Sequence, residues 1–375
     1  MILSVSAFFT ILWTALGTNL FALAGLWALR WRHFFLLQRL SVRSEKSTSR
    51  PGISIVIPAS NAARTLASHL PMLLDQDYPD FEIIVADEAT DDETEDLLKV
   101  LEKTHLTLRH VSLPKGCAHQ SRRRMAATLG IRAARHEWIL LTEADCRPAT
   151  RKWLLRMSEQ MTERHDLIVG CATFFDHENK RFPHAAFLRI REQLPWLHSA
   201  CGGRAALVNS ANLAFRRSWF EQEGGYASTL SFPLDYGENS MLAGTHCRKG
   251  RCSAVCCHEA LVLQDFSGKS QSRKMQKEQR QLVSHLGRSA GRVRFGQRCA
   301  AFSAGLFAVS WLLFFSTLTC FFLTRTFSEL SFSQLPASGQ YGLLTASVLL
   351  FGFLFALLGV RLRNRKAVCR LLYGH

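Results

Sequence analysis

Short apolar runs alternate with polar stretches of helical periodicity through the middle of the chain. The runs cover residues 53–58, 81–87, 106–111 and 138–142, and the segment 121–134 between the last two has the apolar spacing of a helix. Strands and helices that alternate in this way form a parallel sheet covered by helices on both faces. We therefore predict an α/β domain built on a mostly parallel sheet.

Polar side chains follow these strands where a parallel sheet binds its ligands, outside the carboxyl ends of the strands. The first run ends in Pro58-Ala59-Ser60-Asn61, the second leads into the acidic segment 87–92, and the fourth leads into Glu143-Ala144-Asp145-Cys146. The sequence has no GxGxxG after the first strand and no GxxxxGK[ST], which argues against a dinucleotide-binding fold and a P-loop NTPase. A nucleotide site here requires carboxylates and a metal ion.

The two ends of the chain are much more apolar than its middle. Residues 2–29 carry no charge, and residues 300–324 and 341–360 form two more apolar segments. Each is long enough to cross a hydrocarbon core, which takes about 20 residues as a helix. We expect three transmembrane helices, one N-terminal and two in a C-terminal hairpin. A secretory signal is the alternative for the first segment, because Ala22-Leu23-Ala24 resembles a cleavage site, but a basic leading region is missing.

Basic residues next to these apolar segments account for much of the net charge of +16. They precede the hairpin at 288–298 and follow it at 361–370, which by the positive-inside rule places the middle domain in the cytoplasm of a multi-pass inner-membrane protein. Attraction to anionic lipid explains this charge, so we expect a membrane partner and no nucleic acid.

These features predict five parts along the chain. They are an anchor at 1–33, a basic linker at 34–50, a cytoplasmic domain at 51–272, a basic interfacial segment at 273–298, and the hairpin with its basic tail at 299–375.

Cysteine is most concentrated near the end of the predicted domain. Of eleven cysteines, four lie at 247, 252, 256 and 257, between His246 and His258. This group suggests zinc, but it lacks the paired CxxC spacing, and buried thiols on strands are the alternative.

Five stretches of the middle domain together resemble the family 2 glycosyltransferases of the GT-A fold, in their membrane-anchored bacterial form. The likeness runs from Ile53 to Arg280 through ISIVIPASN, QDYPDFEIIVADEATDDET, LGIRAARHEWILLTEADCRP, NSANLAFRRSWFEQEGGY and YGENSMLA. It implies inverting transfer of a sugar from a nucleotide-diphosphate sugar to a membrane-associated glycan or lipid acceptor, with Mg2+ or Mn2+, as in the synthesis of cell-envelope polysaccharide.

The resemblance also implies a donor site. Asp87 would accept hydrogen bonds from the ribose or base, whereas a helix-capping role suits Asp91 or Asp92 better. Glu143 and Asp145 stand at the metal-binding DxD motif, with Asp145 on the metal and Glu143 on the metal, on a metal-bound water or on the ribose. The nucleotide-sugar residues are Pro58, Asn61, Asp87, Arg122, Arg123, Glu143 and Asp145, and the two arginines either hold phosphate or line a solvated helix face.

The remaining candidates concern the transferred sugar and the acceptor. Asn212 lies beside the donor sugar or acceptor in the family, or else closes a turn. Gln279 and Arg280 stand near the place of the QxxRW motif of processive synthases and are expected to approach the acceptor or diphosphate. The tryptophan of that motif is absent, which argues against a processive polymerase.

The catalytic base is the point where the chain departs from the family. Inverting transfer needs a carboxylate that takes the proton of the acceptor hydroxyl, and relatives carry a Glu-Asp or Asp-Asp pair where this chain has Glu238 and Asn239. Glu238 is therefore the predicted base, with Asp235 in reserve. The departure leaves open a catalytically silent homologue that binds a nucleotide sugar or scaffolds a membrane glycan-assembly complex.

Overall fold

The computed structural model describes residues 49–114, 122–179, 181–229, 237–268 and 368–373, together with residues 17, 21, 24, 25, 28, 271, 277, 281, 282, 286 and 302. The chain divides into two compact units, one formed by 1–35 with 294–366 and the other by 36–293 with 367–375. Every helix and strand named below belongs to the second unit.

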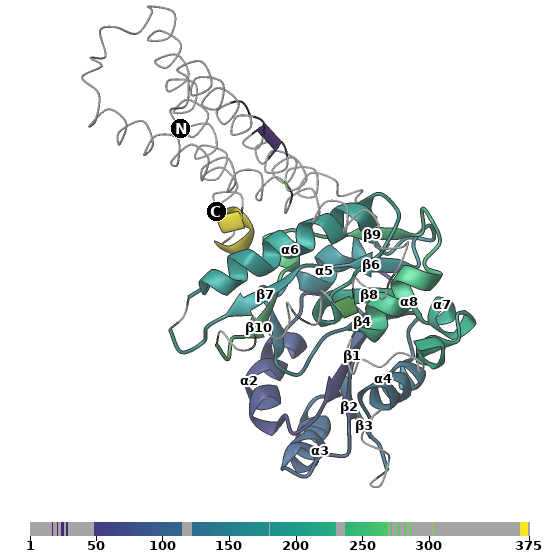
Figure 1. Ribbon diagram of the computed structural model, residues 1–375. Coiled ribbons are helices and arrows are strands. Elements are labelled where there is room, and N and C mark those ends of the chain that lie inside the picture. The colour runs from purple at the N-terminus through teal and green to yellow at the C-terminus, as the bar shows by residue number, and fades with distance from the viewer. Residues whose placement is uncertain are drawn as a thin grey trace, which may run out of the picture. The chain divides into compact units, whose positions relative to one another are not determined.

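Two sheets organise the described part of this unit (Figure 1). In spatial order, the larger sheet contains β3 (Leu108–Ser112), β2 (Phe81–Asp87), β1 (Ile53–Ala59), β4 (Trp138–Leu141), β8 (Leu213–Arg216), β6 (Leu167–Val169) and β9 (Cys252–Ala254). The smaller sheet contains β5 (Cys146–Pro148), β10 (Val262–Asp265) and β7 (Ala172–Phe175).

The larger sheet is mixed, so the prediction of a mostly parallel sheet is wrong. Strand β1 runs parallel to β2 and β4, but β8 runs antiparallel to both β4 and β6. The repeated strand-helix pattern that predicted parallel pairing stops after β4. Beyond that point the strands have three or four residues, too few to show a period in the sequence.

The prediction of three transmembrane helices is contradicted as well. Among the described residues, none of the helices combines the length and the apolar character needed to cross a membrane. Helix α6 (His184–Cys201), for example, has 18 residues but carries Arg189, Arg191 and Glu192. The predicted spans at 2–29, 300–324 and 341–360 lie outside the described residues, apart from six isolated positions.

Helices pack on both faces of the parallel strands (Figure 1). Because side chains alternate along a strand, Val56 of β1 packs with Ala127 and Ile131 of α4, while Ile55 packs with Leu70 of α2 on the other face. The described helices are α2 (Ala63–Leu74), α3 (Thr94–Thr104), α4 (Arg122–Ala133), α5 (Trp153–Ser158), α6, α7 (Arg217–Gln222) and α8 (Glu238–His246), with short 3-10 turns η2 (Ser210–Asn212), η3 (Gly225–Thr229) and η4 (His258–Ala260).

Helix α4 lies close to the sheet because it has a glycine at the contact. A Cβ atom on Gly130 would lie 2.7 Å from Cγ1 of Val56 and 3.2 Å from Cβ of Ala86. Both neighbours are fully buried strand residues, and the rotamers of a β-branched side chain are restricted. The missing side chain therefore sets the distance between α4 and strands β1 and β2, and with it the position of the arginines at the start of α4.

We predict that Gly130→Ala destabilises the domain even though alanine is the better helix former. Overpacking costs about 1–3 kcal/mol, against a gain of about 1 kcal/mol in helix propensity. Urea unfolding measures the difference, with Arg132→Ala at an exposed position of the same helix as the control. A Gly130→Ala protein as stable as the wild type would show that the contact is loose.

Candidate active site

The carboxyl ends of β1 and β2 meet at one edge of the sheet. Ala59 pairs with Asp87 and Pro58 with Ala86, and the backbone N–H of Glu88 donates to the carbonyl of Ala59 at 2.9 Å. Pro58 is buried within β1, one residue before the strand ends. The structure thus brings the first two predicted strand-end segments together.

Asp87 is almost fully buried at this edge. Its side chain is 2% exposed and accepts a hydrogen bond from the backbone N–H of Thr90 at 3.3 Å. Loss of solvent around the carboxyl group raises its pKa. The carboxylate of Asp92, one residue before the N-cap position of α3, accepts from the backbone N–H of Thr94 at 3.1 Å and so helps to begin that helix.

Asn61 joins the loops that follow β1 and β2. It is exposed, has a φ of 47°, and its Oδ1 accepts from the backbone N–H of Asp91 at 3.2 Å. Asparagine tolerates this left-handed conformation better than most residues. Asn61 therefore shapes the rim of the strand-end edge.

The guanidinium group of Arg123 lies among three glutamates from different segments. Its Nη2 lies 2.8 Å from Oε1 of Glu143, and its Nε lies 3.9 Å from Oε1 of Glu238. The charge of Glu143, followed by those of Glu238 and Glu88, raises the pKa of Arg123 against the opposing effect of desolvation. Arg123, the second residue of α4 after Arg122, therefore interacts with glutamates from three segments. These are the segment after β4, the first turn of α8 and the residue that follows β2.

Asp145 is held by neutral partners instead. Its Oδ2 accepts from Nε2 of Gln264 at 2.9 Å, and its Oδ1 accepts from the thiol of Cys146 at 3.4 Å. Burial and the nearby charge of Glu143 raise the pKa of Asp145. The two acids of the motif thus lie in different electrostatic surroundings.

Arg189 and Gln264 form a support for Asp145 that the sequence analysis missed. Nη1 of Arg189 donates to Oε1 of Gln264, and the guanidinium lies 4.4 Å from the ring centroid of Phe174. Arg189 is 5% exposed although it is charged. The sequence holds one signal for this support: Arg189 stands at a position of α6 where the helical spacing calls for an apolar residue. A charged residue that is buried there requires a partner.

Glu238 begins α8 and is, with Asp87, a buried carboxylate of this region. It is 5% exposed, its Oε2 has no hydrogen-bond partner, and burial raises its pKa. Asn239 beside it is satisfied, because its Oδ1 accepts from the hydroxyl of Tyr226 at 2.7 Å and its Nδ2 donates to Oγ of Ser210 at 2.9 Å. Asn239 therefore anchors α8, while Glu238 keeps an unused acceptor.

Asn212, predicted to lie beside the donor sugar or acceptor or else to close a turn, ends the turn η2, and its side chain bonds inside the protein. Asn212 is 0% exposed, donates through Nδ2 to the carbonyls of Cys171 and Ala260 at 2.9 Å each, and accepts from Nε1 of Trp153 at 3.1 Å. These bonds leave no donor of the amide for a ligand. The small residues around Asn212 make room for this internal asparagine: a Cβ on Gly170 would lie 2.3 Å from it.

The comparisons with known proteins agree with this geometry. Residues 54–222 match the family model described as "Glycosyl transferase family 2". These residues form a family 2 glycosyltransferase domain. The chain is accordingly a glycosyltransferase, and its matched segment contains Asp87, Arg123, Glu143 and Asp145, whereas Glu238 lies beyond it.

One solved structure shows the same fold, and two others are similar at lower TM-scores. The mannosyltransferase PcManGT from Pyrobaculum calidifontis, in complex with GDP-Man and Mn2+, has 16% identity and a TM-score of 0.53, with 97% of this chain and 99% of that chain covered. TarS of S. aureus has 15% identity and a TM-score of 0.42, with 63% and 39% covered. GalNAc-T7 with UDP, GalNAc and Mn2+ has 14% identity and a TM-score of 0.46, with 59% and 45% covered. No curated protein sequence matches the chain.

The predicted residues Asp235, Gln279 and Arg280 of the glycosyltransferase lie outside the described residues. The segment from His246 to His258 is described, and its side chains turn to separate partners. Nδ1 of His246 lies 2.8 Å from Oε2 of Glu223, and Nδ1 of His258 lies 3.1 Å from the carbonyl of Leu371. Within 246–258 no three ligand atoms gather, so this segment fits buried thiols rather than zinc.

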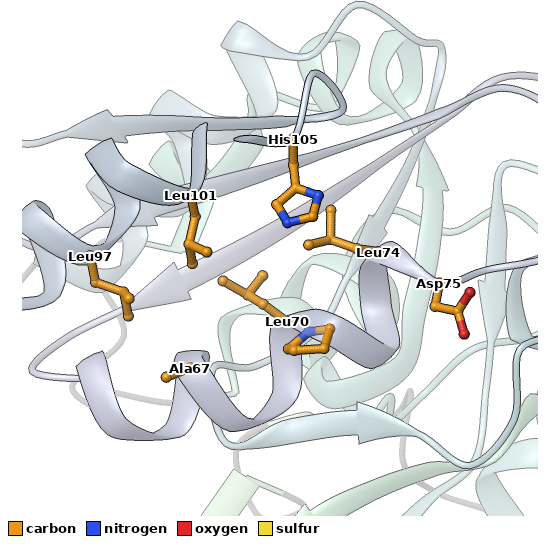
Figure 2. A pocket seen from close by; sticks show the side chains of 8 residues that line it. Ala67, Leu70, Leu74, Asp75, Leu97, Leu101 and His105 are labelled. Atoms are coloured by element: carbon orange, nitrogen blue, oxygen red, sulfur yellow. The ribbon is translucent and has the colours of Figure 1, made fainter. Parts of the chain in front are cut away.

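An apolar groove of about 410 Å³ lies between α2 and α3 (Figure 2). It is lined by Ala67, Leu70, Pro71, Leu74, Asp75, Leu97, Leu101 and His105. None of these residues is among the strand-end acids or Arg123, so the groove is separate from the candidate active site.

We predict that Glu238→Gln makes the glycosyltransferase more stable at pH 8. A carboxyl group whose pKa is raised on folding contributes stability below its unfolded pKa and loses it as the pH rises through the folded pKa. The glutamine removes the buried charge, so the gain in melting temperature should shrink as the pH falls. Glu221→Gln, at an exposed position of α7, is the control. Equal melting temperatures of the variant and the wild type at pH 8 would contradict a destabilising buried charge on Glu238.

Proposed function

We propose that this glycosyltransferase transfers one sugar from a nucleoside-diphosphate sugar to a glycan or lipid acceptor at a membrane surface, with inversion at the anomeric carbon. The observation that carries the proposal is the gathering of Glu143, Glu238 and Glu88 around Arg123 at the carboxyl edge of the sheet. Ligands of open α/β sheets bind at this edge.

Arg123 is the residue suited to the diphosphate of the donor. Its guanidinium presents parallel N–H donors that match phosphate oxygens, and its present partner, Glu143, is itself a candidate metal ligand. We propose that donor binding moves Arg123 from Glu143 to a phosphate group. Asp87, buried beside the same edge, accepts hydrogen bonds from the nucleoside.

The residues of the motif fit a hard divalent cation. Glu143 and Asp145 offer carboxylate oxygens, and the repulsion between the two charges contributes to the raised pKa of Asp145. We propose that Asp145 and Glu143 hold Mg2+ or Mn2+, which would offset negative charge on the diphosphate. PcManGT, which shares the fold, is described with GDP-Man and Mn2+, in line with this class of donor and ion.

Glu238 is the proposed base. Its unpartnered Oε2 is available to accept a proton from the acceptor hydroxyl, and the raised pKa brings the carboxylate closer to the basicity of an efficient catalyst at neutral pH. A single base that activates the acceptor for direct attack gives inversion. Asp235 remains the reserve base by sequence.

The acceptor and the location rest on charge and on cysteine chemistry. A net charge of +16 favours an anionic lipid surface, where a lipid-linked glycan or a lipid is within reach. All eight described cysteines are free, which suits a reducing compartment. We therefore propose that the domain acts in the cytoplasm at the inner membrane.

We predict that Asp145→Asn lowers transfer by about 100-fold or more, because it removes a ligand of an ion whose contribution is several kcal/mol. The assay screens UDP- and GDP-sugars with Mn2+ or Mg2+, and mass spectrometry compares polyprenyl-phosphate-linked with soluble glycan acceptors. Asp96→Asn on the outer helix α3 is the control, because its carboxylate is 85% exposed. Full activity of Asp145→Asn would refute the metal assignment, and donor binding without turnover by the wild type would favour the silent alternative.

We also predict that Arg123→Gln moves the acidic limb of the kcat/KM profile to higher pH. Glu238 must be ionised to accept a proton; burial already raises its pKa, and the positive charge of Arg123 lowers it. Removing that charge raises the pKa further, so activity is lost at a higher pH. Arg123→Lys, which keeps the charge, should leave the limb near its original place. An unmoved limb in Arg123→Gln would show that Glu238 is not the titrating base.

A further inference from the structure

Two histidines and an aspartate meet beside the loop that carries Asp145. His69 comes from the middle of α2, His177 follows β7 by two residues, and Asp265 ends β10. One ligand atom from each residue lies within 4.8 Å of the others. The three are far apart in the sequence, and the proposed function gives them no role.

The distances suit a small cation between these atoms. Nε2 of His69 lies 3.3 Å from Oδ1 of Asp265, and Nε2 of His177 lies 2.9 Å from the same oxygen. In a tetrahedral zinc site with bonds of about 2.0–2.1 Å, neighbouring ligand atoms lie about 3.3 Å apart. A small adjustment of the side chains is enough to place the three ligand atoms around one ion.

The second nitrogen of His69 is placed as in many metal sites. Its Nδ1 lies 3.4 Å from the carbonyl oxygen of Ala144, and its side chain is 2% exposed. Metal-bound histidines commonly donate their other ring N–H to a backbone carbonyl, which fixes the ring and directs the free lone pair at the ion. For His69 that lone pair faces Asp265.

A simple ion pair explains the cluster less well. Nε2 of His177 and Oδ1 of Asp265 are both inaccessible to solvent, yet neither has a hydrogen-bond partner although they lie 2.9 Å apart. The N–H direction of the imidazole therefore misses the oxygen. Two buried polar atoms that approach each other without bonding are satisfied by an ion bound to both.

The surrounding charges narrow the class of ion. Two described charged groups lie around the cluster: Asp176, next to His177, and Arg147 of β5. The guanidinium of Arg147 lies 5.6 Å from the ring centroid of Phe175 and interacts electrostatically with both His177 and Asp265. The positive charge of Arg147 repels a cation, so an ion held only by electrostatic attraction is disfavoured here. Imidazole ligands instead suit zinc and its neighbours among the transition metals, whereas Mg2+ prefers oxygen.

We propose that His69, His177 and Asp265 bind one divalent transition-metal ion, of the zinc class, at a site separate from the carboxylates of Glu143 and Asp145. The ion joins α2, the end of β7 and the end of β10. The ligand residue Asp265 is also bonded to the loop that carries Asp145, because the backbone N–H of Asp265 donates to the carbonyl of Asp145 at 3.0 Å. The site therefore supports the loop on which Asp145 lies, whether or not the proposed transfer is correct.

The test uses the untagged full chain, stripped with a chelator and titrated with Zn2+ and, for its visible absorption, with Co2+. We expect one Zn2+ per chain and a higher melting temperature on binding. His69→Ala, His177→Gln and Asp265→Asn should each weaken Zn2+ binding by about tenfold or more. His177 is one-third exposed, so His177→Gln should fold even if the substitution of the buried His69 does not.

Three controls separate this site from other sources of zinc binding. His105→Ala removes an exposed histidine at the end of α3, Cys247→Ser disrupts the cysteine group, and Asp145→Asn alters the donor motif. All three should keep the ion. The proposal is overturned if the wild type binds no Zn2+ at one per chain, if His177→Gln binds it as tightly as the wild type, or if Asp145→Asn or Cys247→Ser loses it.

Discussion

The guanidinium of Arg123 balances the negative charge that this fold gathers at one edge of its sheet. Glu88, Glu143 and Glu238 come from three segments, and without a shared cation their burial together would be strongly unfavourable. The close packing of α4 at Gly130 places that cation. An edge rich in carboxylates can therefore persist in the folded protein, because Arg123, with a contribution from Arg124 at Glu238, serves as the counter-ion.

The two acids of the motif are prepared differently, and the difference fits two roles. Glu143 pairs with the charge of Arg123, a partner that can exchange for a phosphate, whereas Asp145 is held by the amide of Gln264, which Arg189 supports. A neutral amide orients a carboxylate without quenching its charge. In the proposed metal site, Asp145 would therefore be the fixed ligand, and the engagement of Glu143 would depend on where Arg123 lies.

Sequence reasoning predicted the first half of the domain well, because its strands are buried apolar runs that alternate regularly with helices. Asp87 ends β2, and Glu143 and Asp145 follow β4 within four residues. It failed where this alternation stops or partners are distant: β8 runs antiparallel to β4, and Gln264 is 119 residues from Asp145. The apolar ends predicted spanning helices that the described residues do not contain, since an uncharged run records composition and not the path of the chain.

Hydrogen-bond satisfaction separates structural polar residues from functional ones here better than the motif that contains them. Asn212 and Asn239 both lie in family motifs, yet the amide of each bonds to the protein itself through its oxygen and its nitrogen. Glu238 keeps a buried oxygen without a partner, as does the pair of His177 and Asp265. Because an unpaired buried polar atom costs about 1–3 kcal/mol, a fold keeps one where a ligand later pairs with it. Among the described residues, Oγ1 of Thr90 and Nε of Arg147 also lack a partner, but only at the start of α8 and at the end of β10 do the unpaired atoms include carboxylate oxygens that a ligand or an ion can engage.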